Sequence, residues 1–220
     1  MPAPLTRFAA ALAVCALLAG ACGSRLAPTG AGPSPTAATA PPTSSPAATT
    51  AAAPPGSEAS LRVRATEAVV AFRDKDFAKL AALAHPDKGV GFTPYTFVQP
   101  RDVVLDAATI RQGFANTRTY LWGFSDGKGD ALEWTFERYH GRYVYERDYA
   151  AAPQVLVDNY PQVRGNKYDN TKAVFPSART VEYFFPETGP GPNWSGLRLV
   201  FEDRGGSWYL VGVIHDEWTI

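Results

Sequence analysis

The first part of the globular region has hydrophobic positions at helical spacing. Over residues 61–72, leucine, alanine, valine and phenylalanine recur at this spacing and predict a first helix. A second, shorter helix is expected over 77–84, because Asp76 can cap its start and apolar residues share one of its faces. Pro86 and Gly89 then end it in a turn. The domain is therefore expected to begin with two helices in succession.

Strand and helix signals alternate in the middle of the chain. Residues 90–98 include Pro94, which cannot donate to a central ladder, so this segment is predicted as an edge strand. Asp106 can cap a third helix and Thr135 a fourth, and apolar residues at helical spacing follow each of them. The glycines within residues 125–130 predict a loop between these two helices.

Three strands are predicted near the carboxyl end, where apolar residues alternate over 181–185, 197–201 and 208–214. Two consecutive glycines join the last two strands as a hairpin turn. Counted from the start of the last strand, the alternation places His215 on the face opposite Ile214. Helices first and antiparallel strands afterwards predict a single α+β domain.

The amino-terminal 22 residues have the three parts of an export signal. Arg7 supplies positive charge, and the apolar run over 8–21 is shorter than the roughly 20 residues that a membrane-spanning helix needs. Residues 18–22, LAGAC, resemble the lipobox of bacterial lipoproteins, with Ala19 where leucine is usual. The resemblance implies that Cys22 is acylated and anchors an extracytoplasmic protein to the cell membrane. The alternative is an ordinary secretory signal cut just before Cys22.

Residues 23–58 contain little besides alanine, proline, threonine, serine and glycine, and they show no hydrophobic periodicity. Such a segment buries too little apolar surface to offset its loss of conformational entropy, so we expect a disordered linker. Its eight prolines between Pro28 and Pro55 favour an extended backbone, which suits a spacer between the membrane and a globular domain at 59–220.

Cysteine content and charge exclude several classes of function. Cys15 leaves with the signal and Cys22 takes the lipid, so the domain has no thiol for a disulfide or a zinc site. The three histidines form no close pair, and we expect neither a metal nor a cofactor. The 21 basic and 21 acidic residues balance, which gives no electrostatic footprint for nucleic acid.

Three short motifs match known sites only in part. Residues 85–88, HPDK, contain the tripeptide of J-domain co-chaperones, but a proline-containing strand follows where a long helix is required. A helix-ending turn is predicted there instead. Ser125 and Lys128 have the S-x-x-K spacing of penicillin-binding proteins without the partner motifs. The acidic residues of 126–137 are spaced as in a calcium loop, but Lys128 stands where an oxygen ligand belongs.

Four long segments resemble a family of bacterial lipoproteins of uncharacterised function. The resemblance covers most of residues 60–220 and implies no activity or substrate. The two opening helices and the hairpin that ends in Trp-Tyr-Leu-Val-Gly also resemble the NTF2-like fold. That resemblance implies a cone, in which helices pack on a curved antiparallel sheet and leave a pocket at the open end. The four segments are HPDKGVGFTPYTFV (85–98), YLWGFSDGKGD (120–130), TFERYHGRYVYERDYA (135–150) and WSGLRLVFEDRGGSWYLVGVIHDEWTI (194–220).

Candidate ligand-binding residues come from the histidines and from the acidic and aromatic side chains. His215 with Asp216, or with a distant Asp87, has the chemistry for proton transfer near neutral pH. A surface or hydrogen-bonded structural histidine is the favoured alternative, because one sequence carries no geometry. Most aromatic residues are expected in the core, and some could line a pocket for a sugar or an apolar ligand. The candidate set is His85, Asp87, Tyr95, Trp122, His215, Asp216 and Trp218.

The sequence favours a non-catalytic protein at the cell envelope that holds a ligand or a partner, since the export signal comes without a complete catalytic constellation. The alternative is a small hydrolase or isomerase with His and Asp acid–base residues in the cone, which rests on analogy of fold. The expected contacts are the membrane, through the amino-terminal lipid, and an unidentified envelope protein or small ligand. No nucleic acid is expected.

Overall fold

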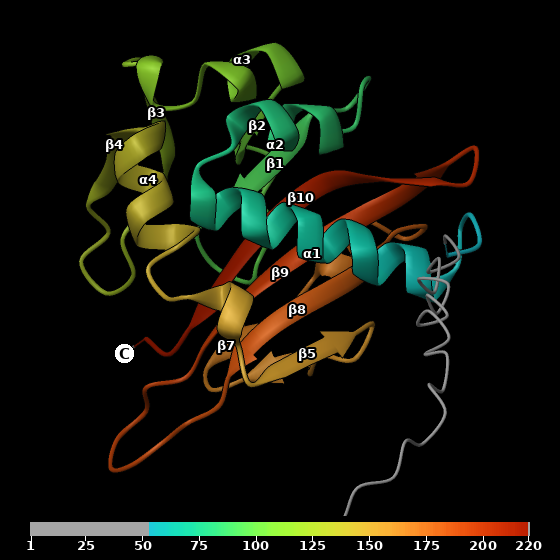
Figure 1. Ribbon diagram of the computed structural model, residues 1–220. Helices are drawn as coiled ribbons and strands as arrows, with labels where there is room; N and C mark the ends of the chain where they lie inside the picture. Colours follow the sequence, from blue (N-terminus) through green and yellow to red (C-terminus); the bar gives the residue numbers. More distant parts are fainter. Residues whose placement is uncertain (1–52, 220) are drawn as a thin grey trace, which may run out of the picture. The chain divides into compact units, whose positions relative to one another are not determined.

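A six-stranded sheet organises residues 53–219, the part of the chain described by a computed structural model (Figure 1). Neighbouring strands are antiparallel, except that β1 runs parallel to β10. The predicted signal peptide, Cys22 and residues 23–52 of the predicted linker lie outside the described residues. In order across the sheet, the strands are β2 (Val103–Leu105), β1 (Val90–Thr93), β10 (Ser207–Glu217), β9 (Ser195–Arg204), β8 (Arg179–Phe185) and β5 (Gln154–Val157).

Two small hairpins stand beside the main sheet. The first pairs β3 (Thr119–Phe124) with β4 (Ala131–Thr135), and the predicted glycine-rich loop is its turn. The second pairs β6 (Val163–Arg164) with β7 (Lys167–Tyr168). The sequence patterns did not predict either hairpin, because β3 alternates little and β6 and β7 have two residues each.

The predicted helices are confirmed, together with their caps. Asp76 accepts a hydrogen bond from the backbone N–H of Lys79 at 2.9 Å. Asp106 does the same for Thr109 at 2.7 Å. Thr135 caps the fourth helix in the same way. The helices are α1 (Glu58–Asp74), α2 (Phe77–Leu83), α3 (Ala107–Gln112), α4 (Phe136–Tyr143) and the short α5 (Thr171–Val174).

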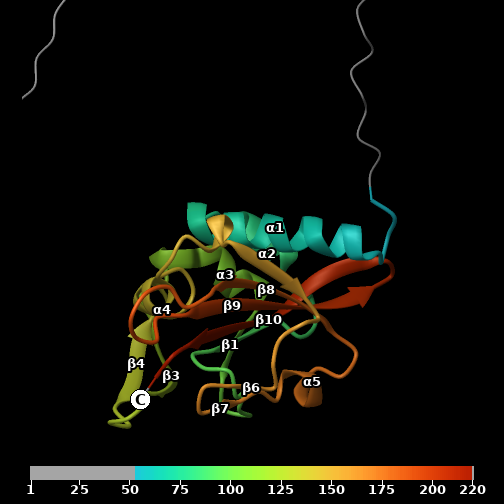
Figure 2. The same ribbon diagram turned by 90° about the horizontal axis from the view of Figure 1, so that it is seen from below.

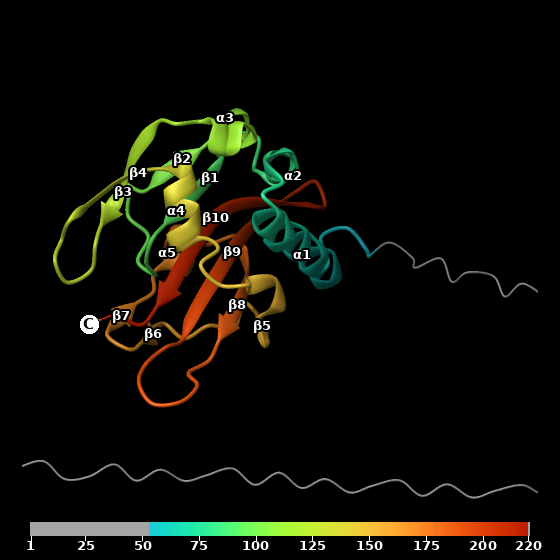
Figure 3. The same ribbon diagram turned by 60° about the vertical axis from the view of Figure 1, so that its left-hand side comes forward.

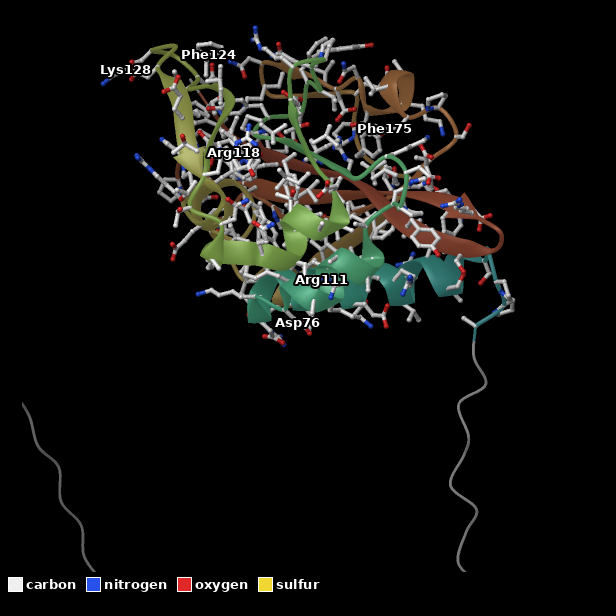
Figure 4. All side chains as sticks on the ribbon, turned by 90° about the horizontal axis from the view of Figure 1, so that it is seen from above. Asp76, Arg111, Arg118, Phe124, Lys128 and Phe175 are labelled. Carbon is white, nitrogen blue, oxygen red and sulfur yellow. The ribbon has the colours of Figure 1, made fainter. Side chains whose placement is uncertain are left out.

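The curved sheet has two differently covered faces (Figure 2). Helices α1 and α2 lie over one of them, which we call the helix-covered face. The β6–β7 hairpin and α5 lie over the other, the hairpin-covered face. Figure 4 shows the same division through side chains, because Phe175 after α5 lies across the sheet from Asp76 and Arg111. The predicted α+β fold is confirmed, with a sheet that is mostly antiparallel.

The helix-covered face carries the main hydrophobic core. Alternate residues of β8, β9 and β10 point into it, and α1, α2 and α4 close it. Aromatic rings fill the space beside α4, where Trp122 stacks on Tyr139 with 3.9 Å between ring centroids. These rings are part of the core, as predicted. Each large side chain that is fully buried here contributes about 1.5–3 kcal/mol to folding. The fully buried large residues of the core include Phe72, Phe92, Trp122, Tyr139, Tyr149, Leu197, Leu199 and Phe201.

Residues 90–98 do not form an edge strand as predicted. Strand β1 ends at Thr93, one residue before Pro94, and it lies inside the sheet between β2 and β10. Pro94 therefore lies outside the hydrogen-bonded part of the strand, and its missing N–H does not restrict β1 to the edge of the sheet. The parallel pairing with β10 brings Thr93 opposite Ile214.

The alternation predicted along the last strand is interrupted by a β-bulge. The register of β10 against β9 shifts between Leu210 and Gly212. One extra residue moves every later side chain to the other face. Trp208 and Leu210 therefore belong to the main core, whereas Ile214 packs with Val200 on the hairpin-covered face.

The described domain begins a few residues before the predicted boundary at residue 59. The Ser57 side chain accepts from the backbone N–H of Ser60 and so caps α1. Gly56 donates to the carbonyl of Gly206 at 3.0 Å, which ties this entry to the β9–β10 turn. Within residues 53–219, no helix has both the length and the apolar character that a membrane crossing requires.

Candidate functional site

Buried charges gather on the hairpin-covered face of the sheet. Glu182 of β8 and Arg198 of β9 are register partners, and both side chains are fully buried. Arg198 donates to the Glu182 carboxylate at 3.1 Å, and it also pairs with Asp169 and donates to the Thr171 hydroxyl. Gly196 leaves room for this cluster, since a Cβ there would lie 3.0 Å from the Glu182 carboxylate.

The β6–β7 hairpin is fastened to the same cluster by its own cations. Arg164 of β6 donates to Glu182 at 2.9 Å and to Asp216 of β10 at 2.8 Å. Lys167 of β7 donates to the backbone carbonyl of Glu217 at 3.0 Å. The last residues of β10 accordingly run beside this hairpin (Figure 3). The pairing is necessary, because an unpaired charge at this depth costs several kcal/mol.

Asp216, like Arg198 through its Nε atom, is incompletely hydrogen-bonded within the cluster. Its Oδ1 atom is buried and has no hydrogen-bond partner within the described residues. Burial raises the pKa of Asp216 to about 6, although Arg164 and Arg198 act in the opposite direction. The Asp216 carboxyl therefore takes up a proton at a higher pH than an exposed aspartate does.

A polar pocket of about 420 Å³ opens beside this cluster, around α5 and the segment that precedes it. This volume lies within the range of small-molecule sites, about 300–1,000 Å³. The lining combines aromatic rings with amide, hydroxyl and charged groups. The lining residues are Asp158, Tyr160, Gln162, Tyr168, Asp169, Asn170, Thr171, Lys172, Ala173, Phe175, Ala178 and Thr180.

The buried side chain of Arg198 contacts several of the residues that line the pocket. Its guanidinium lies 3.6 Å from the ring centroid of Tyr160, a close cation–π contact. It also pairs with Asp169, whose carboxylate accepts the backbone N–H of Thr171 at the start of α5. One buried side chain therefore orders a ring, a carboxylate and a hydroxyl of the pocket, which lowers the entropy lost when a ligand binds.

Asp158 orders the opposite side of the pocket. It adopts a positive φ of 48°, and its carboxylate accepts the backbone N–H of Thr180 at 2.8 Å. Arg179 donates to the same carboxylate at 2.6 Å. Both carboxylates that line the pocket, Asp158 and Asp169, are therefore already paired with arginine.

His85 and Asp87, two of the candidate ligand-binding residues, lie in the turn between α2 and β1. The Nδ1 atom of His85 accepts the backbone N–H groups of Asp87 at 3.2 Å and Lys88 at 3.1 Å, so His85 shapes the turn. Asp87 lines a separate, shallow hollow of about 410 Å³ and pairs with the exposed Arg204. The predicted turn is confirmed, and these residues are not part of the polar pocket.

His215 and Asp216 point to opposite faces of the sheet. His215 lies on the helix-covered face and is fully buried, with Nδ1 3.1 Å from the carbonyl of Pro94 and Nε2 3.0 Å from a Glu146 carboxylate oxygen. Burial of Glu146 raises its pKa. The hydrogen bond to His215 and the charge of that ring lower the pKa by a larger amount, so the pKa of Glu146 is below its usual value. His215 lines neither the polar pocket nor the hollow beside Asp87.

The three aromatic candidates have different surroundings. Trp122 is fully buried and donates from its indole nitrogen to the Trp134 carbonyl at 2.9 Å. Tyr95 lines a small hollow of about 110 Å³ and shares a hydrogen bond with the Tyr143 hydroxyl. Trp218 is 41% exposed at the end of the chain. None of the seven candidates lines the polar pocket, although Asp216 binds the hairpin that forms one of its walls.

The pocket residues were missed because their segment has no clear periodicity. One signal was present in the sequence. Arg198 and Glu182 each interrupt a strongly apolar strand at a position that alternation assigns to one face of the sheet. Charges inside such strands indicate a buried, paired cluster on that face. The partner Arg164 and the pocket wall could not be found in this way.

Comparisons with known proteins find solved structures of low similarity. No protein-family model and no curated protein matches the sequence. Similar solved structures include a DUF3225-family protein of unknown function from Pectobacterium atrosepticum (11% identity, 73% of this chain and 90% of that chain covered, TM-score 0.34). A variant of a protein called Rd1NTF2 has 11% identity, coverages of 72% and 96%, and a TM-score of 0.32. The CaMKII hub homology domain of Chlamydomonas reinhardtii has 16% identity, coverages of 73% and 98%, and a TM-score of 0.29.

Proposed function

We propose that this protein is a lipid-anchored extracytoplasmic lipoprotein whose domain binds a small polar ligand without transforming it. One structural observation carries the ligand-binding part. A pocket of about 420 Å³ is lined by polar and aromatic side chains that a buried ion cluster holds in place. Buried ionic groups are costly to keep, and the organisation of a binding site is a sufficient reason for keeping them.

The anchoring part of the proposal comes from the sequence. An apolar run without charge ends in small residues and then Cys22, and a proline-rich segment separates Cys22 from the domain. Two or more acyl chains on Cys22 would give stable attachment to the membrane, whereas a single chain holds only weakly. The spacer would then let the pocket reach its ligand in the cell envelope.

An NTF2-like cone is the finer fold assignment in this proposal. Its support is the arrangement of α1 and α2 over one side of a curved, mostly antiparallel sheet. Aromatic residues, among them Trp122 and Tyr139, fill the space between α4 and its neighbours in the same core. We therefore assign the ligand site to the hairpin-covered face and not to the interior of the cone.

The acid–base alternative has weaker support. Of its four residues, His85 and Asp87 lie in one turn, and His215 and Asp216 point to opposite faces of the sheet. General acid–base chemistry needs such groups within hydrogen-bond reach of one substrate. The hollow that Asp87 lines does not include His215.

The anchor is tested by labelling cells with an alkyne fatty acid and fractionating their membranes. We expect the wild-type chain to carry the label and to sediment with membranes. Cys22→Ser should lose both properties, whereas Cys15→Ser, inside the removed signal, should keep both. A Cys22→Ser protein that stays in the membrane fraction would exclude the lipid anchor.

The pocket is tested with a library of small polar fragments and NMR of the purified full chain. We expect perturbations that gather on residues 158–180, which form the pocket wall, and none that gather around His215. The ligand-binding proposal fails when no fragment of any chemical class perturbs the pocket.

A further inference from the structure

Both carboxylates that line the pocket already form ion pairs within the protein. Asp169 pairs with Arg198, and Asp158 pairs with Arg179. Lys172 is the remaining charged residue of the lining, and its side chain is exposed to solvent and 3.5 Å from the Ala178 carbonyl. A strongly charged ligand would have to lose its hydration without gaining a buried counter-charge. The electrostatics thus favour a neutral ligand.

Aromatic surface is the second feature of the lining. Arg198 packs against the ring of Tyr160 and fixes its position. The remaining surface of this ring lines the pocket. Tyr168 at the other end of the wall is 55% exposed. Phe175 adds a third, half-buried ring. Rings that are open to solvent beside a pocket offer flat apolar area with a polar tip.

Hydrogen-bonding groups lie between these rings. Gln162 offers a side-chain amide, which has two donors and an acceptor, and the Tyr168 hydroxyl can donate and accept. Thr171 and Thr180 add hydroxyls deeper in the pocket, where Arg198 and Asp158 orient them. An apolar chain that covered the Gln162 amide and the Tyr168 hydroxyl would leave both without partners, at a cost of about 1–3 kcal/mol for each.

A ligand that fits all three features is neutral, has flat C–H faces and carries many hydroxyl groups. We infer that the polar pocket binds a neutral saccharide unit, with its C–H faces on Tyr160 and Tyr168 and its hydroxyls on Gln162 and the threonines. This inference rests on the proposed ligand-binding function. It adds the chemical class of the ligand, for which a glycan of the cell envelope is the natural source.

The test is calorimetric titration of the full chain in micelles of a detergent without a sugar headgroup. The neutral probes are N-acetylglucosamine, its disaccharide and maltose. The comparison probes are glucuronate, which adds a carboxylate to a sugar ring, and the dipeptide dialanine. We expect binding of at least one neutral saccharide, and at least tenfold weaker binding of both comparison probes.

Two pocket variants and a matched control complete the test. Tyr168→Ala should weaken saccharide binding at least tenfold, and Gln162→Ala at least threefold. Val163→Ala is the control, because Val163 lies on the same hairpin, is 61% exposed and does not line the pocket. It should bind within twofold of wild type. Urea unfolding of each variant checks that the fold is kept.

Each remaining outcome overturns a defined part of the account. Binding of dialanine or glucuronate in preference to neutral sugars, with the same loss in Tyr168→Ala, overturns the saccharide class and leaves ligand binding in place. Saccharide binding that is equal in Tyr168→Ala, Gln162→Ala and wild type overturns the assignment to this pocket. No heat with any saccharide overturns the inference, and the fragment experiment then decides whether the pocket binds anything.

Discussion

The two faces of the sheet are built from the same strands but are covered through different interactions, apolar packing on one face and ion pairs on the other. In β9, Leu197 and Leu199 point into the apolar core under the helices, whereas Arg198 between them points to the ion cluster under the hairpin. The helix-covered face is closed by aromatic and aliphatic contacts. The hairpin-covered face is closed by Arg164 and Lys167, which reach the sheet from a hairpin of four strand residues.

This difference separates stability from binding. Apolar burial is non-directional and tolerates small shifts, so it suits the face that holds the domain together. Ion pairs are directional and orient the groups around them, so they suit the face that presents a ligand site. The four predictions below test this division, from the largest expected effect to the smallest.

Removal of the central cation should have the largest effect. Arg198→Ala leaves Glu182 and Asp169 buried beside one another with less compensation, and it should lower the free energy of unfolding by about 3–5 kcal/mol. Urea denaturation measures this value. Arg204→Ala is the matched control on the same strand, because its pair with Asp87 is exposed, and it should cost less than about 1 kcal/mol. Equal effects of the two variants would show that the cluster is not buried as described.

The helix-covered face should lose stability in acid through His140. Burial lowers the pKa of His140 to about 4, against an ordinary value of 6.5, while its hydrogen bond to the Phe72 carbonyl acts in the opposite direction. The unfolded chain thus binds more protons between these two values, and the free energy of unfolding falls as pH falls from 6.5 to 4. The contribution reaches about 3 kcal/mol.

His140→Gln removes this titration and keeps a side chain that can donate to the Phe72 carbonyl. Urea unfolding at a series of pH values should therefore give a shallower acid slope for the variant than for wild type. Parallel slopes for the two proteins would contradict the burial of His140.

The hairpin-covered face should respond to acid with the opposite sign. The pKa of Asp216 is about 6 in the folded protein, against an ordinary value of 3.8, because burial disfavours its charge. The folded chain thus binds more protons between these values, and this group makes unfolding harder as pH falls from 6 to 4. Asp216→Asn should raise the free energy of unfolding at pH 7.5 by about 1–3 kcal/mol.

Asp216→Asn should also lose the gain in stability that wild-type Asp216 shows on acidification. Its matched control is Asp203→Asn, an exposed carboxyl on the neighbouring strand β9. A loss of stability at pH 7.5 in Asp216→Asn would show that the ion pair with Arg164 outweighs the burial of the carboxylate.

The smallest effect should come from an ion pair at the surface. Lys88 and Glu202 form a pair in which the lysine is well exposed, and such pairs contribute about 0.2–1 kcal/mol. A double-mutant cycle with Lys88→Ala and Glu202→Gln measures the coupling directly. A coupling as large as that between Arg198 and Glu182 would remove the contrast between the exposed and the buried pairs.

The sequence predicted well those parts of the fold that rest on local signals. Asp76, Asp106 and Thr135 cap helices as expected, because a cap needs only its own residue and the next turn. The three carboxyl-terminal strands were found from alternation. Non-local features were lost, among them the parallel pairing of β1 and the bulge that moves His215 to the helix-covered face.

The candidate site was harder to predict for the same reason. His215 and Asp216 are neighbours in the chain, but a strand sends them to opposite faces. The pocket is built from residues 158–180, where short pieces of strand and helix meet the sheet through side chains such as Arg164, Lys167 and Phe175. Such contacts depend on tertiary packing, which has no period in the sequence.

The central claim is that ligand binds on the hairpin-covered face and leaves the helix-covered face unchanged. Fluorine NMR of the full chain labelled with fluorotyrosine tests it directly, with N-acetylglucosamine and maltose as probes and single Tyr→Phe variants for assignment. We predict that the resonances of Tyr160 and Tyr168 shift with added saccharide, while those of Tyr139, Tyr143 and Tyr149 stay in place. Shifts confined to the three buried tyrosines, or no shift at any tyrosine, would contradict the account.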